Sequence, residues 1–384
     1  MSDNAAIDGL AASQRIRGVL APVVTPFKGN FSPDSKRFIA HCKWLLSQNC
    51  GLAVFGTNSE ANSLSMEERS MLLDQLVAAG VDPSRMMPGA GCCSIMETVK
   101  LTTQAVEHGC AGVLMLPPFY YKDVSEEGLY RYFSEVVQRV GDVRLKIYLY
   151  HIPPVAVVGI TRGLVERLLA AYPNAIAGMK DSSGDWNNTR MFLDAFVRAG
   201  QAVRDRYEAI SKSQTPISKS QGRSKIQHPK GERALDVRRS SDADADSSFD
   251  VFVGSESFLL TNMRNGGAGT ISGTANINPA AICELYIAAT GEVEDPPSSG
   301  SGRTTARPDL EGLQSRLNVV RAVFSNREFP SMIAALKQAI AIYTDDPAWA
   351  KVRPPLVELT SEQAKTLTAE LSVIGFRWRK IKEK

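Results

Sequence analysis

Short apolar, β-branched runs alternate with longer amphipathic stretches between Gly18 and about Ser272. A short apolar run bounded by turn residues is typical of a buried strand, whereas apolar residues spaced three and four apart indicate a helix. The runs predict eight strands, at residues 19–24, 52–56, 86–90, 112–116, 145–150, 175–180, 250–254 and 268–272. The stretches between them predict helices that include 34–48, 66–79, 96–108, 125–139, 162–171 and 187–198.

Eight alternations of strand and helix predict an α/β fold, a closed parallel (β/α)₈ TIM barrel. The usual length of such a barrel, ~250 residues, suits residues 18–290 once an insertion is discounted. Ser65, followed three residues later by Glu68, has the pattern of a capping box and predicts the start of the second helix. In a TIM barrel the loops that follow the strands carry the chemistry, so the residues directly after the predicted strands are the first candidates for a site.

The rest of the chain divides into segments that do not belong to the barrel. Residues 1–17 are an N-terminal tail, 295–308 read as a flexible Pro, Ser and Gly linker, and 309–384 predict a C-terminal helical region with helices at 309–325, 329–343 and 361–374.

Residues 202–248 are polar and lack helix or strand periodicity, so we expect a disordered insertion. The segment joins a predicted helix to a predicted strand, which places it on the face opposite the catalytic loops. Three interpretations stay open: a docking or modification site, a tolerated surface insertion, or sequence from an imperfect gene prediction.

Composition narrows the class of protein. Hydrophobic residues make up 43% of the chain and charged residues 22%, as in ordinary globular proteins, and the formal net charge is only +3. This small charge argues against a general nucleic-acid surface. No apolar run is long enough to span a membrane, and Met1–Gly18 lacks a secretory apolar core, so we expect a soluble cytoplasmic protein. Six scattered cysteines fit reduced core thiols.

Lys180 is the most informative single residue, because it ends the short apolar run 175–179 and is followed by Asp181. An ammonium is costly to remove from water, so a lysine at the rim of a buried strand should either be ion-paired or serve as a nucleophilic amine. A lysine amine can condense with a ketone to form a Schiff base. The alternative is an ordinary salt bridge with a neighbour such as Asp181, and this segment alone favours neither.

Further polar groups follow neighbouring predicted strands. Tyr150 ends the strand before that of Lys180, and neighbouring strands lie about 4.8 Å apart, so the two side chains are able to meet. A phenol there is a suitable proton carrier, although a merely buried tyrosine would fit as well. Thr57 and Asn58 lie in a turn whose backbone N–H groups suit a carboxylate. The aromatic block 117–121 suits either the rim of the site or a subunit interface.

Together these motifs resemble the dihydrodipicolinate synthase and N-acetylneuraminate lyase family of pyruvate-handling class I aldolases. The resemblance runs from about Gly18 to Asn278, with the helical tail also similar, and is interrupted by the insertion. It is carried by Gly56-Thr57-Asn58-Ser59-Glu60, Pro118-Phe119-Tyr120-Tyr121-Lys122, Glu127-Gly128-Leu129, Tyr150-His151-Ile152-Pro153, Lys180-Asp181-Ser182-Ser183-Gly184, Gly254-Ser255-Glu256 and Gly269-Thr270-Ile271-Ser272.

The resemblance implies a role for each matching residue. Lys180 would form the Schiff base with pyruvate or another 2-keto acid, and an aldehyde would be the second substrate. Tyr150 would relay protons, and Thr57 would link it to Tyr121, which a neighbouring subunit lends. The amides of Thr57 and Asn58 would hold the pyruvate carboxylate, and Ile271 would line the pocket. The family is typically tetrameric, built from tight dimers, so we expect a homotetramer or homodimer.

Departures from the family pattern limit the expected reaction. Asn58 replaces a hydroxyl residue, and Ser59 replaces a glycine, which would reshape the turn if that glycine has a positive φ. Val155 stands where a true dihydrodipicolinate synthase has an arginine that clamps aspartate semialdehyde. That lost contact is worth ~1.5 to 3 kcal/mol, so the lysine-pathway activity is not expected.

Two alternatives to an aldolase stay open. One is a keto-deoxy sugar acid dehydratase that uses the same lysine, and the other is a catalytically silent 2-keto acid binding protein. The four histidines lack the spacing of metal ligands, so no metal is expected. A lysine Schiff base stabilises a carbanion without a cofactor, so no cofactor is expected either.

Overall fold

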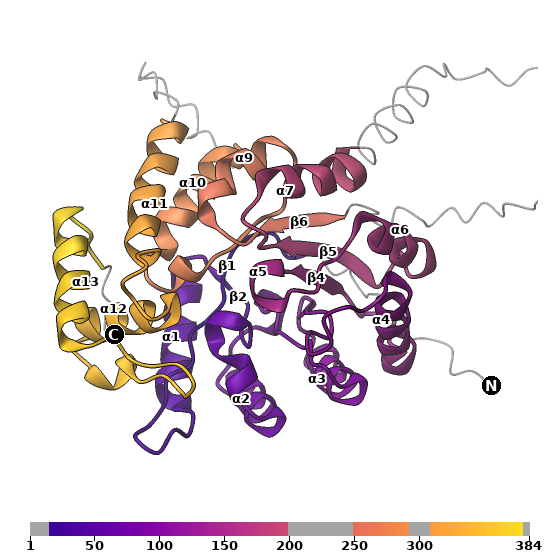
Figure 1. Ribbon diagram of the computed structural model, residues 1–384, viewed down its shortest axis with the longest axis horizontal. Helices are drawn as coiled ribbons and strands as arrows, with labels where there is room; N and C mark the ends of the chain where they lie inside the picture. Colours follow the sequence, from indigo (N-terminus) through magenta and orange to yellow (C-terminus); the bar gives the residue numbers. More distant parts are fainter. Residues whose placement is uncertain (1–14, 199–248, 292–307, 379–384) are drawn as a thin grey trace, which may run out of the picture.

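The computed structural model describes residues 15–198, 249–291 and 308–378 (Figure 1). The predicted insertion at 202–248 and the predicted linker at 295–308 fall almost entirely outside these ranges, as does most of the predicted tail at 1–17. Within the described part, no helix is long and apolar enough to cross a membrane.

Among the described residues, seven strands form one parallel sheet in the order β2-β1-β7-β6-β5-β4-β3. Their bounds are β1 Gly18–Ala21, β2 Gly51–Leu52, β3 Val113–Met115, β4 Ile147–His151, β5 Ile176–Asp181, β6 Asp250–Val253 and β7 Gly269–Ile271. Each of these strands begins or ends within one residue of the predicted boundary, and most are shorter than predicted.

The one predicted strand without a regular counterpart, 86–90, lies between β2 and β3 and closes the ring there. Met87 N donates to Leu52 O at 2.8 Å on the β2 side, and Ala90 N donates to Leu114 O at 3.0 Å on the β3 side. Only isolated bridges result, and Pro88 within the segment has no N–H to donate. The protein is therefore a (β/α)₈ barrel, as the alternation predicted.

Helices surround the barrel and follow the predicted order (Figure 1). Their bounds are α1 Ser35–Ser47, α2 Met66–Ala78, α3 Ile95–Glu107, α4 Glu126–Val140, α6 Arg162–Ala171, α7 Trp186–Phe192 with a π-helical turn at Leu193–Arg198, α9 Leu259–Arg264 and α10 Pro279–Thr290. The predicted capping box of α2 is confirmed, because Ser65 Oγ accepts from Glu68 N and Glu68 Oε2 accepts from Ser65 N. A short helix, α5 Pro153–Ala156, follows β4 and was not predicted, and α9 and α10 were not among the predicted segments either.

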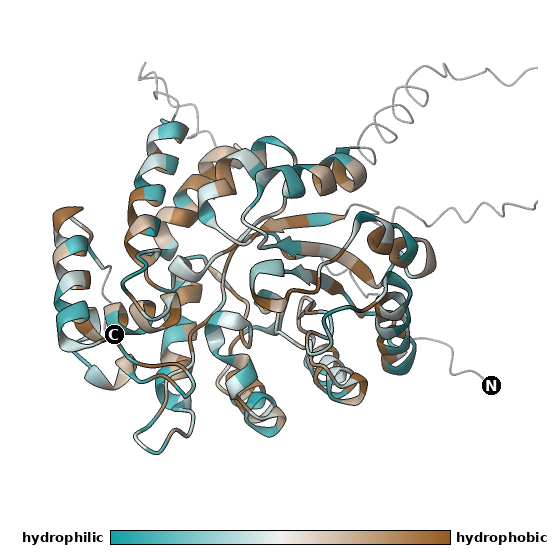
Figure 2. Cartoon of the chain, in the orientation of Figure 1, coloured by the Kyte–Doolittle hydropathy of each residue, from teal (hydrophilic) through white to brown (hydrophobic). Residues whose placement is uncertain are grey.

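Two apolar layers hold the barrel together. A large layer between strands and helices includes Leu45, Leu72, Phe133 and Phe192, all fully buried. Figure 2 shows the corresponding hydrophobic stripes on the helices where they face the sheet. A smaller cluster fills the interior of the ring and contains Tyr150 among other residues. The tight interior leaves the barrel open to ligands only at its ends.

The C-terminal helical region forms a third apolar cluster beside the barrel. Its helices are α11 Leu310–Phe324, α12 Met332–Thr344 and α13 Ser361–Val373, close to the predicted bounds. Figure 1 shows α11 running beside α10 and α12 lying near α1. The region therefore lies against the barrel, and side chains of α11 and α12 contact Ser272 and Glu60 in the loops at the barrel mouth.

Candidate active site

Lys180 and Tyr150 lie side by side at the C-terminal end of the sheet. They are paired in the register of β4 and β5, and Lys180 Nζ lies 3.3 Å from Tyr150 OH. Nζ also lies 4.4 Å from the centroid of the Tyr150 ring. Both residues are buried, with 3% of each exposed. The prediction that these two side chains meet is confirmed.

The salt-bridge alternative for Lys180 is wrong. Successive side chains of a strand point to opposite faces, so Asp181 points away from Lys180. Its carboxylate accepts hydrogen bonds from Ser183 N at 2.8 Å, Asn188 Nδ2 at 3.1 Å and Thr189 Oγ1 at 2.6 Å. Within the described ranges, Lys180 makes no ion pair, and its amine is left with a phenol for a partner.

Thr57 extends this contact to the loop after β2. Its Oγ1 lies 3.4 Å from Tyr150 OH, so the amine, the phenol and the hydroxyl form a continuous chain of groups that can pass a proton. Thr57 and Asn58 begin the short 3₁₀ helix Thr57–Ser59. The first N–H groups of such a helix have no intrahelical partner and are suited to an anionic ligand.

Replacement of glycine by Ser59 does not distort this turn. The left-handed residue is Glu60, with φ 55°, whereas Ser59 belongs to the 3₁₀ helix. Ser59 Oγ accepts a hydrogen bond from Gly56 N at 3.2 Å, and Ser59 O accepts one from Thr25 Oγ1 at 2.7 Å. Ser59 therefore stabilises the turn through both its hydroxyl and its backbone carbonyl.

A buried ion pair joins this turn to α12. Lys337 Nζ, on α12, lies 2.7 Å from Glu60 Oε1 and donates to Thr25 O at 2.8 Å. Both charged side chains are fully buried. Burial lowers the pKa of Lys337 to about 8, although the Glu60 carboxylate opposes the shift. Glu60 Oε2 also accepts from Arg353 N at 2.8 Å. The pair was not predicted, although a lysine inside the apolar run of α12 is a sequence signal for one.

A cavity of about 260 Å³ opens at this end of the barrel. The predicted residues Lys180, Tyr150, Thr57, Asn58 and Ile271 all line it. A second cavity, of about 430 Å³, lies at the N-terminal end of the strands and contains none of them. Because the loops at the C-terminal end of the strands carry the chemistry in this fold, we take the smaller of these two cavities as the candidate active site.

Tyr121 is the one predicted site residue that the chain does not bring to the cavity. It is 74% exposed, and its ring packs edge-on against Tyr120 with centroids 5.2 Å apart. The expectation that it serves a neighbouring subunit stays a prediction.

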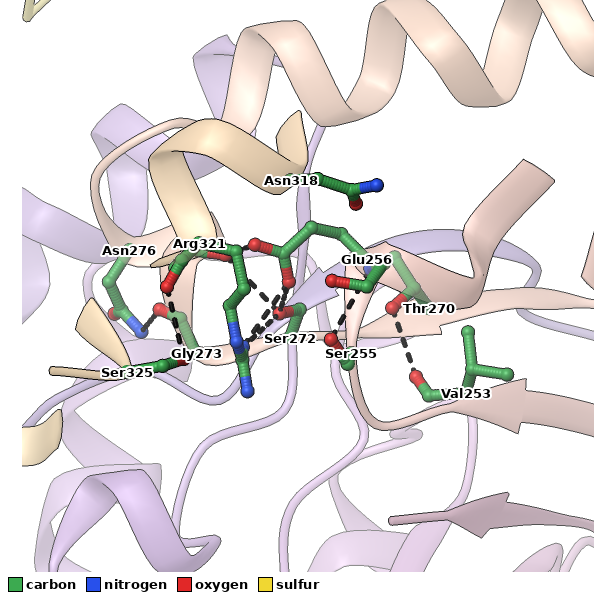
Figure 3. Close-up of polar contacts among 12 residues, drawn as sticks. Val253, Ser255, Glu256, Thr270, Ser272, Gly273, Asn276, Asn318, Arg321 and Ser325 are labelled. Atoms are coloured by element: carbon green, nitrogen blue, oxygen red, sulfur yellow. Dashed lines mark hydrogen bonds and ion pairs between the residues drawn. The ribbon is translucent and has the colours of Figure 1, made fainter. Parts of the chain in front are cut away.

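A second polar cluster borders the same cavity (Figure 3). Glu256, in the turn after β6, is 1% exposed and accepts hydrogen bonds from the hydroxyls of Ser272 and Thr274. Arg321, on α11, pairs with it through Nη1 at 3.3 Å from Oε2. Sequence reasoning assigned Glu256 no role and missed Arg321, because nothing in the sequence shows which face of α11 meets the barrel.

Known proteins with similar sequences decide the family. A model of the dihydrodipicolinate synthetase family matches residues 15–198. The 4-hydroxy-tetrahydrodipicolinate synthase of Thermus thermophilus is 31% identical over 276 residues, which cover 71% of this chain and 74% of that protein. The chain belongs to the dihydrodipicolinate synthetase family. An uncharacterized DapA-like lyase of Chloroflexus aurantiacus is 26% identical over 356 residues and matches 92% of this chain and 95% of its own length.

Solved structures of the family have the same architecture. Dihydrodipicolinate synthase from Agrobacterium tumefaciens aligns with a TM-score of 0.69 at 25% identity, over 94% of this chain and 99% of that one. A double variant of the 2-keto-3-deoxygluconate aldolase of Sulfolobus solfataricus aligns with a TM-score of 0.68 at 16% identity, over 93% and 96% of the two chains, and shows the fold alone. The named relatives are aldolase-type lyases, so the family membership also indicates a lyase.

Val155, where the resemblance led us to expect an arginine in a dihydrodipicolinate synthase, also lies at the cavity. It lies on α5, is 61% exposed and lines the cavity. Its isopropyl group can neither donate a hydrogen bond nor carry charge at that rim. Arg321 lines the same cavity but comes from the C-terminal helical region.

Proposed function

We propose that this protein is a class I lyase that joins pyruvate, or another 2-keto acid, to an aldehyde, or releases it from the corresponding product. The observation that carries the proposal is the buried amine of Lys180, unpaired by any described carboxylate and 3.3 Å from the Tyr150 phenol. An amine held in this way can attack a ketone carbon, whereas an ion-paired ammonium cannot.

The steps follow from the chain of groups at the cavity. The Lys180 amine adds to C2 of the keto acid, and loss of water gives an imine. The imine draws electrons from C3, so C3 loses a proton and becomes the nucleophilic carbon of an enamine. This carbon bonds to the aldehyde carbon, whose oxygen takes a proton, and water then releases the product and regenerates the amine. Tyr150, bonded to Thr57, is positioned to carry these protons.

Binding of the keto acid would use the turn after β2. The N–H groups of Thr57 and Asn58 would hold its carboxylate, and Ile271 would pack against its carbon chain, since all three residues line the cavity. A neighbouring subunit would supply Tyr121, which requires a homodimer or a homotetramer of such dimers.

Proton exchange tests the first half of this reaction without an aldehyde. The protein is incubated with pyruvate in heavy water, and the methyl signal of pyruvate is followed by NMR. We expect the wild-type protein to replace the C3 protons with deuterium and Lys180→Ala to lose this activity. Exchange that survives in Lys180→Ala would exclude the imine.

The second substrate is found with a panel of aldehydes and keto-deoxy acids. Pyruvate consumed with an aldehyde, or released from a keto-deoxy acid, supports the lyase; loss of water without pyruvate release would indicate the dehydratase instead. Because Val155 cannot clamp a carboxylate, aspartate semialdehyde should be a poor partner. If it proves the best one, the reasoning about Val155 is wrong.

A further inference from the structure

Arg321 presents unused hydrogen-bond donors to the active-site cavity. Its Nη1 contacts Glu256 Oε2 at 3.3 Å and Ser272 Oγ at 3.2 Å. A guanidinium carries five N–H donors in a planar fork. Among the described residues, Nε and Nη2 contact no protein acceptor, and Figure 3 shows one nitrogen directed away from Glu256. The Arg321 side chain is 22% exposed, so its open edge is accessible from the cavity.

The surroundings hold this guanidinium in place. Both carboxylate oxygens of Glu256 already accept hydrogen bonds from hydroxyl groups, those of Ser272 and Thr274. Glu256 therefore contacts only Nη1 of the Arg321 guanidinium, and Nε and Nη2 stay available to a ligand. On the same helix, Gln314 Nε2 donates to Glu256 O at 2.9 Å and Gln314 Oε1 accepts from Leu260 N at 3.0 Å. These contacts hold α11 against the loop after β6 and the start of α9. Arg321 is therefore fixed before a ligand arrives, which reduces the entropy lost on binding.

We propose that Arg321 binds an anionic group, a carboxylate or a phosphate, at the far end of the second substrate. Guanidinium is suited to both anions, because its parallel N–H groups match two oxygens at once. The inference rests on the proposed function, since it assigns the aldehyde partner of the same cavity.

The position of Arg321 also separates this substrate from that of dihydrodipicolinate synthase. The arginine missing at Val155 would follow β4, whereas Arg321 contacts the loops after β6 and β7. The anion would thus lie on a different side of Lys180. An aldehyde whose only charged group is an anion could then be accepted although the arginine expected after β4 is absent. Aspartate semialdehyde would still be a poor partner, because the ammonium beside its carboxylate would repel the Arg321 guanidinium.

Three variants test this assignment. Arg321→Gln removes the guanidinium. Because this leaves Glu256 buried without its cation, the double variant Glu256→Gln/Arg321→Gln, which removes both charges, is measured beside it. Arg316→Gln is the matched control, since Arg316 is an exposed arginine of the same helix and does not line the cavity. Thermal unfolding of each variant confirms that it folds.

The readouts are kcat/KM with pyruvate for three aldehydes and the exchange of pyruvate protons. The aldehydes are succinic semialdehyde, glyceraldehyde 3-phosphate and neutral glyceraldehyde. For the better anionic aldehyde, we expect kcat/KM to fall about tenfold or more in both Arg321 variants, the effect of losing a charge-assisted contact. Glyceraldehyde, proton exchange and the Arg316 control should change little. Whichever anion the wild-type protein prefers identifies the group.

The outcomes distinguish this inference from the proposed function. A wild-type protein that exchanges pyruvate protons but prefers neither anionic aldehyde over glyceraldehyde would overturn the role of Arg321 and leave the lyase standing. Equal losses with charged and neutral aldehydes would also overturn it. Absence of Lys180-dependent exchange would instead remove the proposed function.

Discussion

Replacement of Lys337 by methionine should destabilise the protein through the turn that we propose to hold the keto acid. Lys337 and Glu60 are both fully buried, and their charged atoms lie 2.7 Å apart. Without the ammonium, the Glu60 carboxylate keeps one described hydrogen bond, from Arg353 N. Leaving one member of a buried ion pair uncompensated costs about 3 to 5 kcal/mol. Total unfolding free energies are only about 5 to 15 kcal/mol, so the loss is a large fraction.

Denaturant unfolding measures this loss, and a double variant separates its cause. In Lys337→Met/Glu60→Gln neither position of the pair carries a buried charge, so most of the lost stability should return. Lys351→Met is the matched control, because Lys351 pairs with Glu358 at 3.3 Å and both side chains are about one-third exposed or more. Such a pair is worth at most about 1 kcal/mol.

The same variant should also affect binding. Glu60 is the left-handed residue that ends the turn of Thr57 and Asn58, so displacement of its side chain should raise the KM for pyruvate. A Lys337→Met protein that loses no more stability than Lys351→Met would refute the reasoning. A double variant as unstable as the single one would refute it as well.

Three further predictions concern the proton relay, the subunit arrangement and pH. The Tyr150→Phe variant should fold normally and exchange pyruvate protons about 100-fold more slowly than the wild-type protein, or slower still, because general acid-base catalysis usually contributes at least this much. A variant that exchanges at the wild-type rate would exclude the phenol as the proton carrier. Lys180→Ala and Tyr121→Phe should each be inactive alone but regain activity when co-expressed, because one mixed site then has both an intact lysine and an intact tyrosine; no recovery would place Tyr121 outside the neighbour's site. His41 is buried against Asn276, and burial lowers its pKa to about 4. Below about pH 6.5 the unfolded chain therefore binds a proton at this residue more readily than the folded protein does. The contribution of neutral His41 to the unfolding free energy is complete above that pH, and it is lost as the pH falls towards 4, by up to about 1.4 kcal/mol per pH unit. His41→Gln should therefore lose less unfolding free energy than the wild-type protein between these pH values, and parallel curves would contradict this.

The barrel could be predicted because its signals are local. Apolar runs bounded by turns locate the strands, and in a parallel sheet this also fixes which residues meet at the strand ends. Lys180 and Tyr150 were brought together in this way. The same local reasoning left the salt bridge to Asp181 open, and strand alternation together with the acceptor contacts of Asp181 decided against it.

The contacts between the helical region and the barrel could not be predicted. Arg321 is 65 residues from Glu256 and Lys337 is 277 from Glu60, so neither pairing has a local pattern. An amphipathic helix shows that one face is buried but not what that face meets. The place of Ser59 was also hidden, since the positive φ of this turn lies one residue later than the replaced glycine suggested.

Reductive trapping tests the central claim, the imine at Lys180, most directly. The protein is treated with borohydride in the presence of pyruvate, and the peptides are analysed by mass spectrometry. We predict a reduced pyruvyl adduct on Lys180 that is absent from Lys180→Ala and still forms in a control such as Lys146→Ala, whose lysine lies outside the cavity and contacts Asn174 O. No adduct at saturating pyruvate, or an adduct on another lysine, would contradict the account.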